Sequence, residues 1–179
     1  MKQKIPKVNT KYIKVRNSKI HSKGVYAKKN IKKGTKIIEY IGEIICKDEG
    51  DKRAQEQYKQ HKKDKNSGAV YIYDLTKKYD LDGNFKYNPA RLINHSCEPN
   101  AKYKQIGLRI FIVSIKPIKK GEEITYDYGY DLDDYKQHKC RCGSKKCIGY
   151  IIGKNYRNDF KRLLQKKSNN SLHKQQTYY

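Results

Sequence analysis

The sequence predicts a mostly β domain built from short strands, with one or two helices at its periphery. Segments rich in Ile, Val and Tyr are separated by glycines at the places where tight turns would join strands. No period of roughly 20 to 50 residues repeats, which excludes a solenoid. The strand-like segments are residues 12–16, 24–27, 36–46, 70–75, 79–81, 101–105 and 108–115.

Two stretches of the chain favour helices. Residues 47–63 are highly charged and lack proline, and Ala54 and Tyr58 stand four residues apart, on one face of a helix. Near the carboxyl end, apolar residues again recur at helical spacing, and the residues beyond them have little to bury. We therefore expect an exposed helix, and a docking helix followed by disorder. The residues of the second pattern are Tyr156, Phe160, Leu163 and Leu164.

Size and charge limit what the chain can be. Its 179 residues suffice for one domain, and a hydrophobic content of 36% without a long apolar run predicts no membrane span. The first 36 residues hold 13 Lys or Arg and no acid, which is unlike a secretory signal. The net charge of +24 would attract nucleic acid or an acidic partner, although a solvated lysine surface is equally compatible with it.

Two polar stretches are hard to explain by packing alone. Residues 91–100 read RLINHSCEPN, in which Asn94 and His95 suit either a ligand site or a hydrogen-bonded turn. Residues 122–130 read EEITYDYGY, which places three alternating tyrosines on one face if the segment is extended. A β-strand with an aromatic face is the simpler interpretation of the second stretch.

The cysteines point to a metal rather than to disulfides. Their number, five, is odd, and the pattern CxCxxxxC of Cys140, Cys142 and Cys147 can wrap a tetrahedral ion. Cys97 can supply the fourth ligand only if the chain returns across about 40 residues. Zinc in a reducing compartment is therefore the better interpretation, and we expect the remaining Cys46 to be a small buried hydrophobe.

The order of several motifs resembles a known family. HSKGVYA, EYIGE, YDL, NPARLINHSCEPN, GEEITYDYGY and CRCGSKKCIGY follow one another as in the SET-domain protein lysine methyltransferases with a post-SET zinc motif. The resemblance covers roughly residues 12 to 152. The segment around Gly24 has a single glycine and lacks the glycine-rich turn of a Rossmann unit, so a nucleotide-like cofactor would need another platform.

The resemblance implies a fold and an organisation of the chain. The fold would be the SET-domain β-clip, with a C-terminal pseudoknot in which residues 126–130 thread beneath the loop of residues 94–97. A basic N-terminal arm would precede the SET domain, and a zinc segment and a basic tail would follow it. The implied boundaries are 1–11 for the arm, 12–136 for the SET domain, 137–153 for the post-SET segment and 154–179 for the tail.

The resemblance also assigns roles to individual residues. Tyr128 would be the catalytic tyrosine, and Tyr40 and Tyr126 would line the channel for the substrate lysine. Zinc would be held by Cys97, Cys140, Cys142 and Cys147. Contacts to the cofactor S-adenosylmethionine would fall on His21, Lys23, Gly24, Tyr71, Asn94 and His95.

Some positions depart from the family pattern. Ser22 stands where many members have glycine, Leu92 replaces the usual Phe, and Tyr87 precedes Asn88 where glycine is common. These differences bear on cofactor affinity rather than on fold. No cysteine occurs before Cys46, so the resemblance does not extend to a cysteine-rich pre-SET region.

The implied function is a protein-lysine N-methyltransferase that uses S-adenosylmethionine and one structural Zn²⁺. Its substrate would be a histone tail or another basic, DNA-associated protein, attracted by acids within residues 122–134, and Tyr126 favours monomethylation. We expect a monomer in the nucleus or on chromatin, or in the host nucleus for a microbial protein, with electrostatic contact to DNA. The alternative is a zinc-stabilised chromatin- or nucleic-acid-binding module with a degenerate SET domain.

Overall fold

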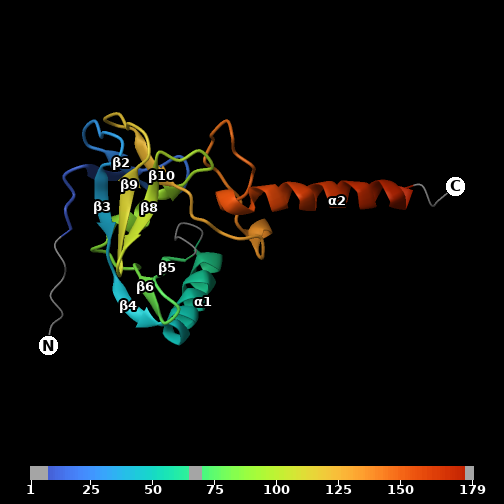
Figure 1. Cartoon of the computed structure of the whole chain (residues 1–179), viewed down its shortest axis with the longest axis horizontal. Coiled ribbons are helices and arrows are strands. Elements are labelled where there is room, and N and C mark those ends of the chain that lie inside the picture. Colours follow the sequence, from blue (N-terminus) through green and yellow to red (C-terminus); the bar gives the residue numbers. More distant parts are fainter. Residues whose placement is uncertain (1–7, 65–69, 176–179) are drawn as a thin grey trace. The chain divides into compact units, whose positions relative to one another are not determined.

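The structure is a computed structural model that describes residues 8–64 and 70–175, with side chains described up to residue 166. The predicted arm and tail both extend beyond the described residues, by residues 1–7 and 176–179. The chain forms two compact units (Figure 1). The first comprises the chain up to Asn94 together with Pro99–Tyr126, and the second comprises His95–Glu98 together with the chain from Asp127 onward.

Short strands in three small sheets make up most of the first unit (Figure 1). One sheet has the order β1-β2-β10-β7, the second β3-β9-β8 and the third β4-β6-β5. This architecture confirms the predicted mostly β fold. The strand bounds are β1 Ile13–Asn17, β2 Lys23–Ala27, β3 Lys36–Tyr40, β4 Glu43–Cys46, β5 Ile72–Asp74, β6 Tyr79–Asp82, β7 Asn94–His95, β8 Ala101–Ile106, β9 Arg109–Ser114 and β10 Glu123–Tyr126.

Strand β9 is the central strand of its sheet and has a nearly continuous apolar sequence. It pairs antiparallel with β3 on one side and with β8 on the other. Ile110 and Ile112 are completely buried, and Phe111 on the opposite face is partly covered by the Arg109 guanidinium, 5.0 Å from its ring centre. From Ile110 to Ser114 the residues on both faces of the strand are buried or half-buried, so the alternation of apolar and polar residues is lost.

The segment predicted as one strand, residues 36–46, is two strands in different sheets. The break falls at Ile41 and Gly42, where the chain leaves β3 and enters β4. A Cβ atom on Gly42 would lie 1.9 Å from the carbonyl oxygen of Asp82. Only glycine allows this approach of two backbones, so Gly42 sets the point at which the chain changes sheet.

Helix α1 spans Lys47–Lys63, as the sequence predicts. The expectation for Cys46 is wrong, because this residue is exposed and precedes the first turn of α1. Arg53 of α1 donates to the carboxylates of Glu43, Glu49 and Asp82, and these hydrogen bonds raise its pKa. The helix is therefore attached to its sheet by polar contacts, which explains why its sequence shows so weak an apolar face.

The second unit is organised around a small aromatic core. Tyr135, Ile152 and Phe160 are buried in it. The rings of Tyr135 and Phe160 meet edge to face with their centres 5.1 Å apart, and Tyr150 contacts both. Two residues of the apolar pattern near the carboxyl end take part, since Phe160 is buried and Leu163 packs against the core, so the predicted docking helix exists. The helices of the second unit are η2 Tyr135–Gln137, η3 Lys154–Tyr156 and α2 Arg157–Gln175.

The segment EEITYDYGY is only partly a strand. Strand β10 ends at Tyr126, and Gly129 has a φ of +77°, which an extended strand does not allow. Tyr128 and Tyr130 therefore lie beyond the strand, and the expectation of one aromatic strand face is wrong for them. The pseudoknot and the point at which the tail becomes disordered stay predictions. Within the described residues, neither long helix is apolar enough to cross a lipid bilayer.

The buried side chain of Gln57 links α1 to β6 and to the residue that precedes β5. Gln57 is 7% exposed, its Nε2 donates to Asp82 at 3.2 Å, and its Oε1 accepts the N–H of Tyr71 at 2.9 Å. We expect Gln57→Ala to lower the free energy of unfolding by about 1–3 kcal/mol, because both partners lose a buried hydrogen bond. Urea unfolding measures the change. Gln55→Ala, on the exposed side of the same helix, is the matched control and should stay within about 0.5 kcal/mol of the parent. Equal effects of the two substitutions would contradict this role.

Candidate active site and metal centre

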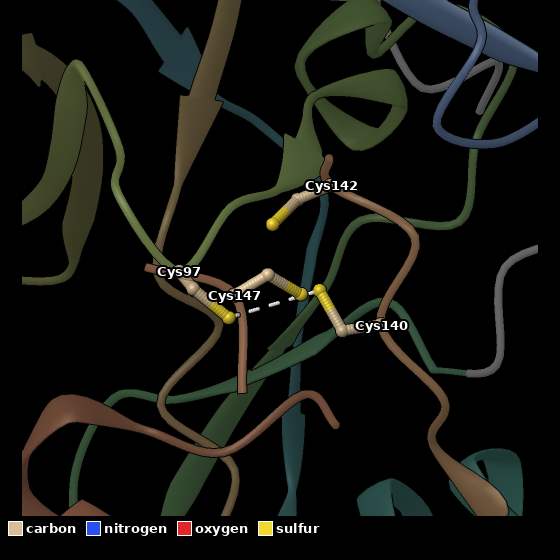
Figure 2. Close-up of side chains that lie close together, drawn as sticks. All are labelled: Cys97, Cys140, Cys142 and Cys147. Atoms are coloured by element: carbon tan, nitrogen blue, oxygen red, sulfur yellow. Dashed lines mark hydrogen bonds between the residues drawn. The ribbon is translucent and has the colours of Figure 1, made fainter. Parts of the chain in front are cut away.

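Four thiols converge in the second unit (Figure 2). Cys97 lies in the loop that follows β7, and the other three come from the loops between η2 and η3. The four Sγ atoms all lie within 4.8 Å of one another, and those of Cys97 and Cys140 are 3.8 Å apart. Four thiolates about 2.3 Å from one tetrahedral zinc would stand about 3.8 Å from each other. The donor set and its spacing therefore suit a structural zinc.

Tight turns hold the cysteine-bearing loops together. The N–H of Cys147 donates to the carbonyl of Ser144, and that of Cys140 donates to the carbonyl of Gly149. Gly143 and Gly149 have positive φ angles of 64° and 81°. These glycines turn the chain sharply enough for a CxCxxxxC segment to surround one point.

The thiols of Cys97 and Cys140 strongly influence each other's pKa. The contact with Cys140 lowers the pKa of Cys97 to about 3, and the same contact raises the pKa of Cys140. Physically, one negative charge is stabilised between two adjacent sulfurs while a second is disfavoured. A divalent cation removes that conflict, since it binds the deprotonated form of every thiol.

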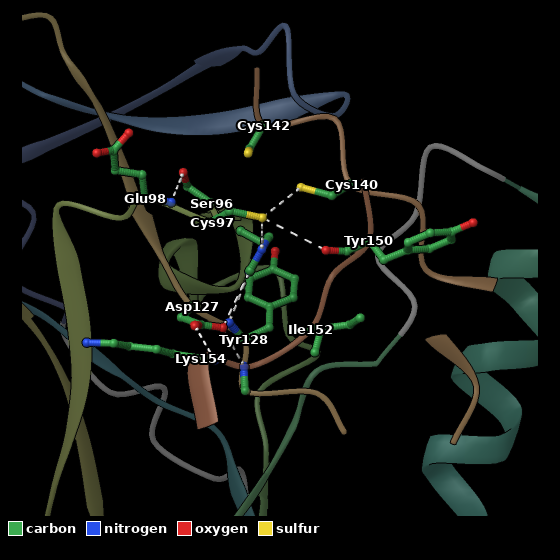
Figure 3. Close-up of polar contacts among 12 residues, drawn as sticks. Ser96, Cys97, Glu98, Asp127, Tyr128, Cys140, Cys142, Tyr150, Ile152 and Lys154 are labelled. Carbon is green, nitrogen blue, oxygen red and sulfur yellow. Dashed lines mark hydrogen bonds and ion pairs between the residues drawn. The ribbon is translucent and has the colours of Figure 1, made fainter. Parts of the chain in front are cut away.

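Tyr128 lies in the second unit near this cluster (Figure 3), and its ring meets the ring of His95. The Tyr128 N–H donates to His95 Nδ1 at 3.2 Å, and the two ring centres are 5.4 Å apart. The other ring nitrogen, Nε2, is 3.6 Å from the Cys97 sulfur. The buried imidazole thus connects the backbone of Tyr128 with a cysteine of the cluster.

A cluster of tyrosines lies in the first unit. Tyr73 is its centre, with ring centres 4.7 Å from Tyr40 and 6.4 Å from Tyr126. The Tyr40 hydroxyl donates to the carbonyl oxygen of Tyr71 at 2.9 Å. Tyr40 and Tyr126 are both buried, and both lie close to Tyr73. The structure therefore brings two of the predicted channel residues together in one aromatic wall.

A polar node of the first unit gathers three of the predicted cofactor residues. Asn94 Nδ2 donates both of its hydrogens, to the carbonyl of Lys23 at 3.0 Å and to Glu123 at 2.8 Å. A Cβ atom on Gly24 would lie 2.3 Å from the same Glu123 carboxylate. A side chain at position 24 would therefore have to displace the Glu123 carboxylate, which is held by its hydrogen bonds to Ser18, Tyr26 and Asn94.

His21 and Tyr71, the other predicted cofactor residues, lie at the ends of loops in the first unit. His21 is half-buried in the turn that joins β1 to β2, next to Ser22, whose φ of +35° is in the left-handed region. That conformation explains why glycine suits position 22. Tyr71 lies under the Arg91 guanidinium, 5.3 Å from its ring centre.

Sequence reasoning missed the acid at the centre of the polar node. Glu123 was grouped with the acids that would attract a basic substrate, but its carboxylate accepts hydrogen bonds from Ser18, Tyr26 and Asn94. Glu122 and Asp127 also have internal partners. The exposed acids of that stretch are Asp131, Asp133 and Asp134.

Comparison with known families decides the relationship. Residues 22–129, more than half of the chain, match the SET domain model. The chain belongs to the SET-domain family. The match includes every predicted site residue except His21 and the three cysteines that follow position 129, and it confirms the family resemblance drawn from the motifs.

Related SET proteins agree with this assignment. The chain is 38% identical over 144 residues to histone-lysine N-methyltransferase trithorax of Drosophila virilis, covering 78% of this chain and 4% of that protein. It is 39% identical over 149 residues to histone-lysine N-methyltransferase set-2 of Caenorhabditis elegans, covering 81% and 10%. Set1 of Dictyostelium discoideum is 39% identical over 145 residues, covering 79% and 9%. The chain thus spans a tenth or less of the length of these relatives.

Removal of one thiol should release the metal of this SET protein. In Cys142→Ser the hydroxyl is a far weaker zinc ligand than a thiolate. We expect the parent to bind about one zinc per chain and the variant to lose most of it, and we expect residues 138–152 to be less protected from hydrogen exchange in the variant. Metal analysis and exchange mass spectrometry measure both effects. Cys46→Ser, outside the cluster, is the matched control and should retain the metal. Full retention of zinc in Cys142→Ser would contradict the assignment.

Proposed function

We propose that this SET protein transfers a methyl group from S-adenosylmethionine to the side-chain amine of a lysine in a protein. The observation that supports this most directly is the aromatic wall of Tyr40, Tyr73 and Tyr126, in which Tyr40 and Tyr126 are buried and Tyr73 is half-buried. Tyr128 follows Tyr126 two residues later in the sequence. The names of the related proteins, all histone-lysine N-methyltransferases, support the same reaction.

The tyrosine wall suits the main chemical difficulty of the reaction. A lysine amine has a pKa of about 10.4 in water, and only its neutral form has a lone pair that can attack a methyl group. An apolar, aromatic channel disfavours the ammonium form by desolvation. The Tyr128 hydroxyl would orient the amine, and the buried tyrosines would exclude water from it. S-adenosylmethionine, when bound, supplies a methyl group activated by a positively charged sulfur.

The polar node suggests how the cofactor is held. Because both hydrogens of Asn94 Nδ2 are donated within the protein, its Oδ1 is the atom that would accept from an ammonium group of the cofactor. The ring of His95 is engaged by Tyr128 and Cys97, so His95 would contact the cofactor through its backbone. We propose that Lys23, Gly24, His21 and Tyr71 complete the site, and that zinc is structural.

A basic protein tail is the proposed substrate, and a histone is the first candidate. The exposed Asp131, Asp133 and Asp134 follow Tyr128 closely and would attract such a tail. We further propose a monomer that acts on chromatin in the nucleus, in a reducing compartment. The protein's own positive charge would contact DNA, and one group of lysines lies beside the start of β1, where Lys11 and Lys29 are 5.0 and 4.9 Å from the Tyr12 ring centre.

A pure binding module is the second candidate, favoured by the net charge of +24 and by the cysteine cluster. The two functions differ in their need for S-adenosylmethionine. A zinc-stabilised binding module would bind DNA or a histone without binding the cofactor. Calorimetry with S-adenosylmethionine therefore separates them.

Tyr128→Phe tests the proposed catalytic residue. The substitution removes one hydroxyl that acts on the amine, so we expect kcat to fall by roughly ten-fold or more with little change in cofactor affinity. Transfer of labelled methyl groups to histones and calorimetric titration measure the two quantities. Tyr79→Phe, at a half-exposed strand position in the first unit, is the matched control and should behave as the parent. Turnover of Tyr128→Phe at the parent rate would exclude the catalytic role.

Tyr126 should set the number of methyl groups added. A hydroxyl in a desolvated channel is costly to leave unpaired, by about 1–3 kcal/mol, so displacing its partner to admit a methylated amine slows the second transfer. We expect monomethyl-lysine from the parent and a shift to dimethyl- and trimethyl-lysine in Tyr126→Phe. Mass spectra of early and late products measure the ratio. Rapid accumulation of trimethyl-lysine with the parent protein would refute this role.

A further inference from the structure

One arginine at the start of α2 makes contacts that neither the family motifs nor the proposed chemistry explain. Arg157 is largely buried, with 19% of its side chain exposed. Its guanidinium donates to the carbonyl of Cys97 at 2.8 Å, to the carbonyl of Ile152 at 3.2 Å and to Asp127 Oδ2 at 3.1 Å. A planar group with five fixed donors can join three chain segments in this way, and lysine cannot.

The Asp127 carboxylate transmits this contact to the backbone around Tyr128 (Figure 3). Its Oδ1 accepts the N–H of Gly129 at 3.1 Å, and its Oδ2 accepts the N–H of Lys154 at 2.9 Å as well as Arg157. Asp127 therefore closes a turn over Tyr128 and ties that turn to the chain that leads into α2.

The turn at Tyr128 is confined on its other sides as well. The Tyr128 N–H is held by His95, and the N–H of Gly153 donates to the carbonyl of Tyr130 at 2.8 Å. A Cβ atom on Gly153 would lie 2.8 Å from the backbone of Gly129, so the two segments are in close contact. The Asp127 carboxylate therefore completes a set of contacts that fixes the backbone on both sides of Tyr128.

We propose that Arg157 is a positioning residue for Tyr128, acting through the Asp127 carboxylate. The inference rests on the proposed function for its catalytic consequence and on the observed hydrogen bonds for its structural one. Arg157 neutralises a carboxylate that is 21% exposed and fixes its orientation, so the carboxylate can bind the N–H groups of Gly129 and Lys154 together. Without Arg157, the carboxylate would turn toward solvent and loosen the Tyr128 turn.

Arg157→Gln tests this inference through turnover. We expect kcat to fall by roughly ten- to a hundred-fold with unchanged cofactor affinity, since small displacements of a reacting group have effects of this size. Arg157→Lys keeps the positive charge but loses the planar set of donors, so its kcat should lie between those of the parent and of Arg157→Gln. In a Tyr128→Phe background the same substitution should change kcat by about two-fold or less, because the hydroxyl that Arg157 positions is absent. Equal losses in both backgrounds would overturn the proposal.

A second measurement does not depend on activity. Arg157→Gln should speed the hydrogen exchange of the Gly129 and Lys154 amides by roughly ten-fold or more, measured by NMR on the zinc-loaded protein. Arg162→Gln, on the exposed side of the same helix with Asp159 as its partner, is the matched control. Unchanged exchange at both amides in Arg157→Gln, or loss of zinc in step with activity, would overturn the positioning role. A parent protein without methyl transfer would refute the proposed function but leave the exchange result valid.

Discussion

The second unit depends on one long-range constraint, the return of Cys97 to three cysteines that lie at least 43 residues further along the chain. The same loop contains His95, whose ring joins Cys97 to the backbone of Tyr128. A metal that draws the four thiols together therefore also fixes the imidazole, and with it the turn that carries the proposed catalytic tyrosine. In this arrangement, a zinc ion held by the four thiols and the proposed catalytic tyrosine would share one support.

In the first unit, tyrosine rings are buried, and their hydroxyl groups therefore need hydrogen-bond partners inside the protein. Tyr40 illustrates this, because its ring packs against Tyr73 while its hydroxyl binds the carbonyl of Tyr71. Gly83 leaves room for that ring, since a Cβ atom there would lie 2.0 Å from it. Gln57 in turn fixes the N–H of Tyr71, so the exposed helix α1 contributes to the aromatic wall through one buried amide.

Much of the site could be predicted from the sequence, and the limits have physical causes. The cysteine spacing and the Asn-His-Ser-Cys run indicated the metal cluster, because few ligand types bind zinc and their spacing is restrictive. Glu123, Gln57 and Arg157 could not be predicted, since their partners lie far away in the sequence and charged or polar side chains usually face solvent. The same limit explains the error at Cys46, where an apolar strand ends at an exposed helix start.

The most direct test is the stoichiometry of methyl transfer by the zinc-loaded protein with S-adenosylmethionine and a set of lysine-rich proteins that includes histones. The structure and its family predict that S-adenosylhomocysteine and methyl-lysine form in equal amounts, and that both stop when the substrate lysine is replaced by arginine. A zinc-loaded, folded protein that binds these substrates yet forms neither product would contradict the proposed function and favour the binding module.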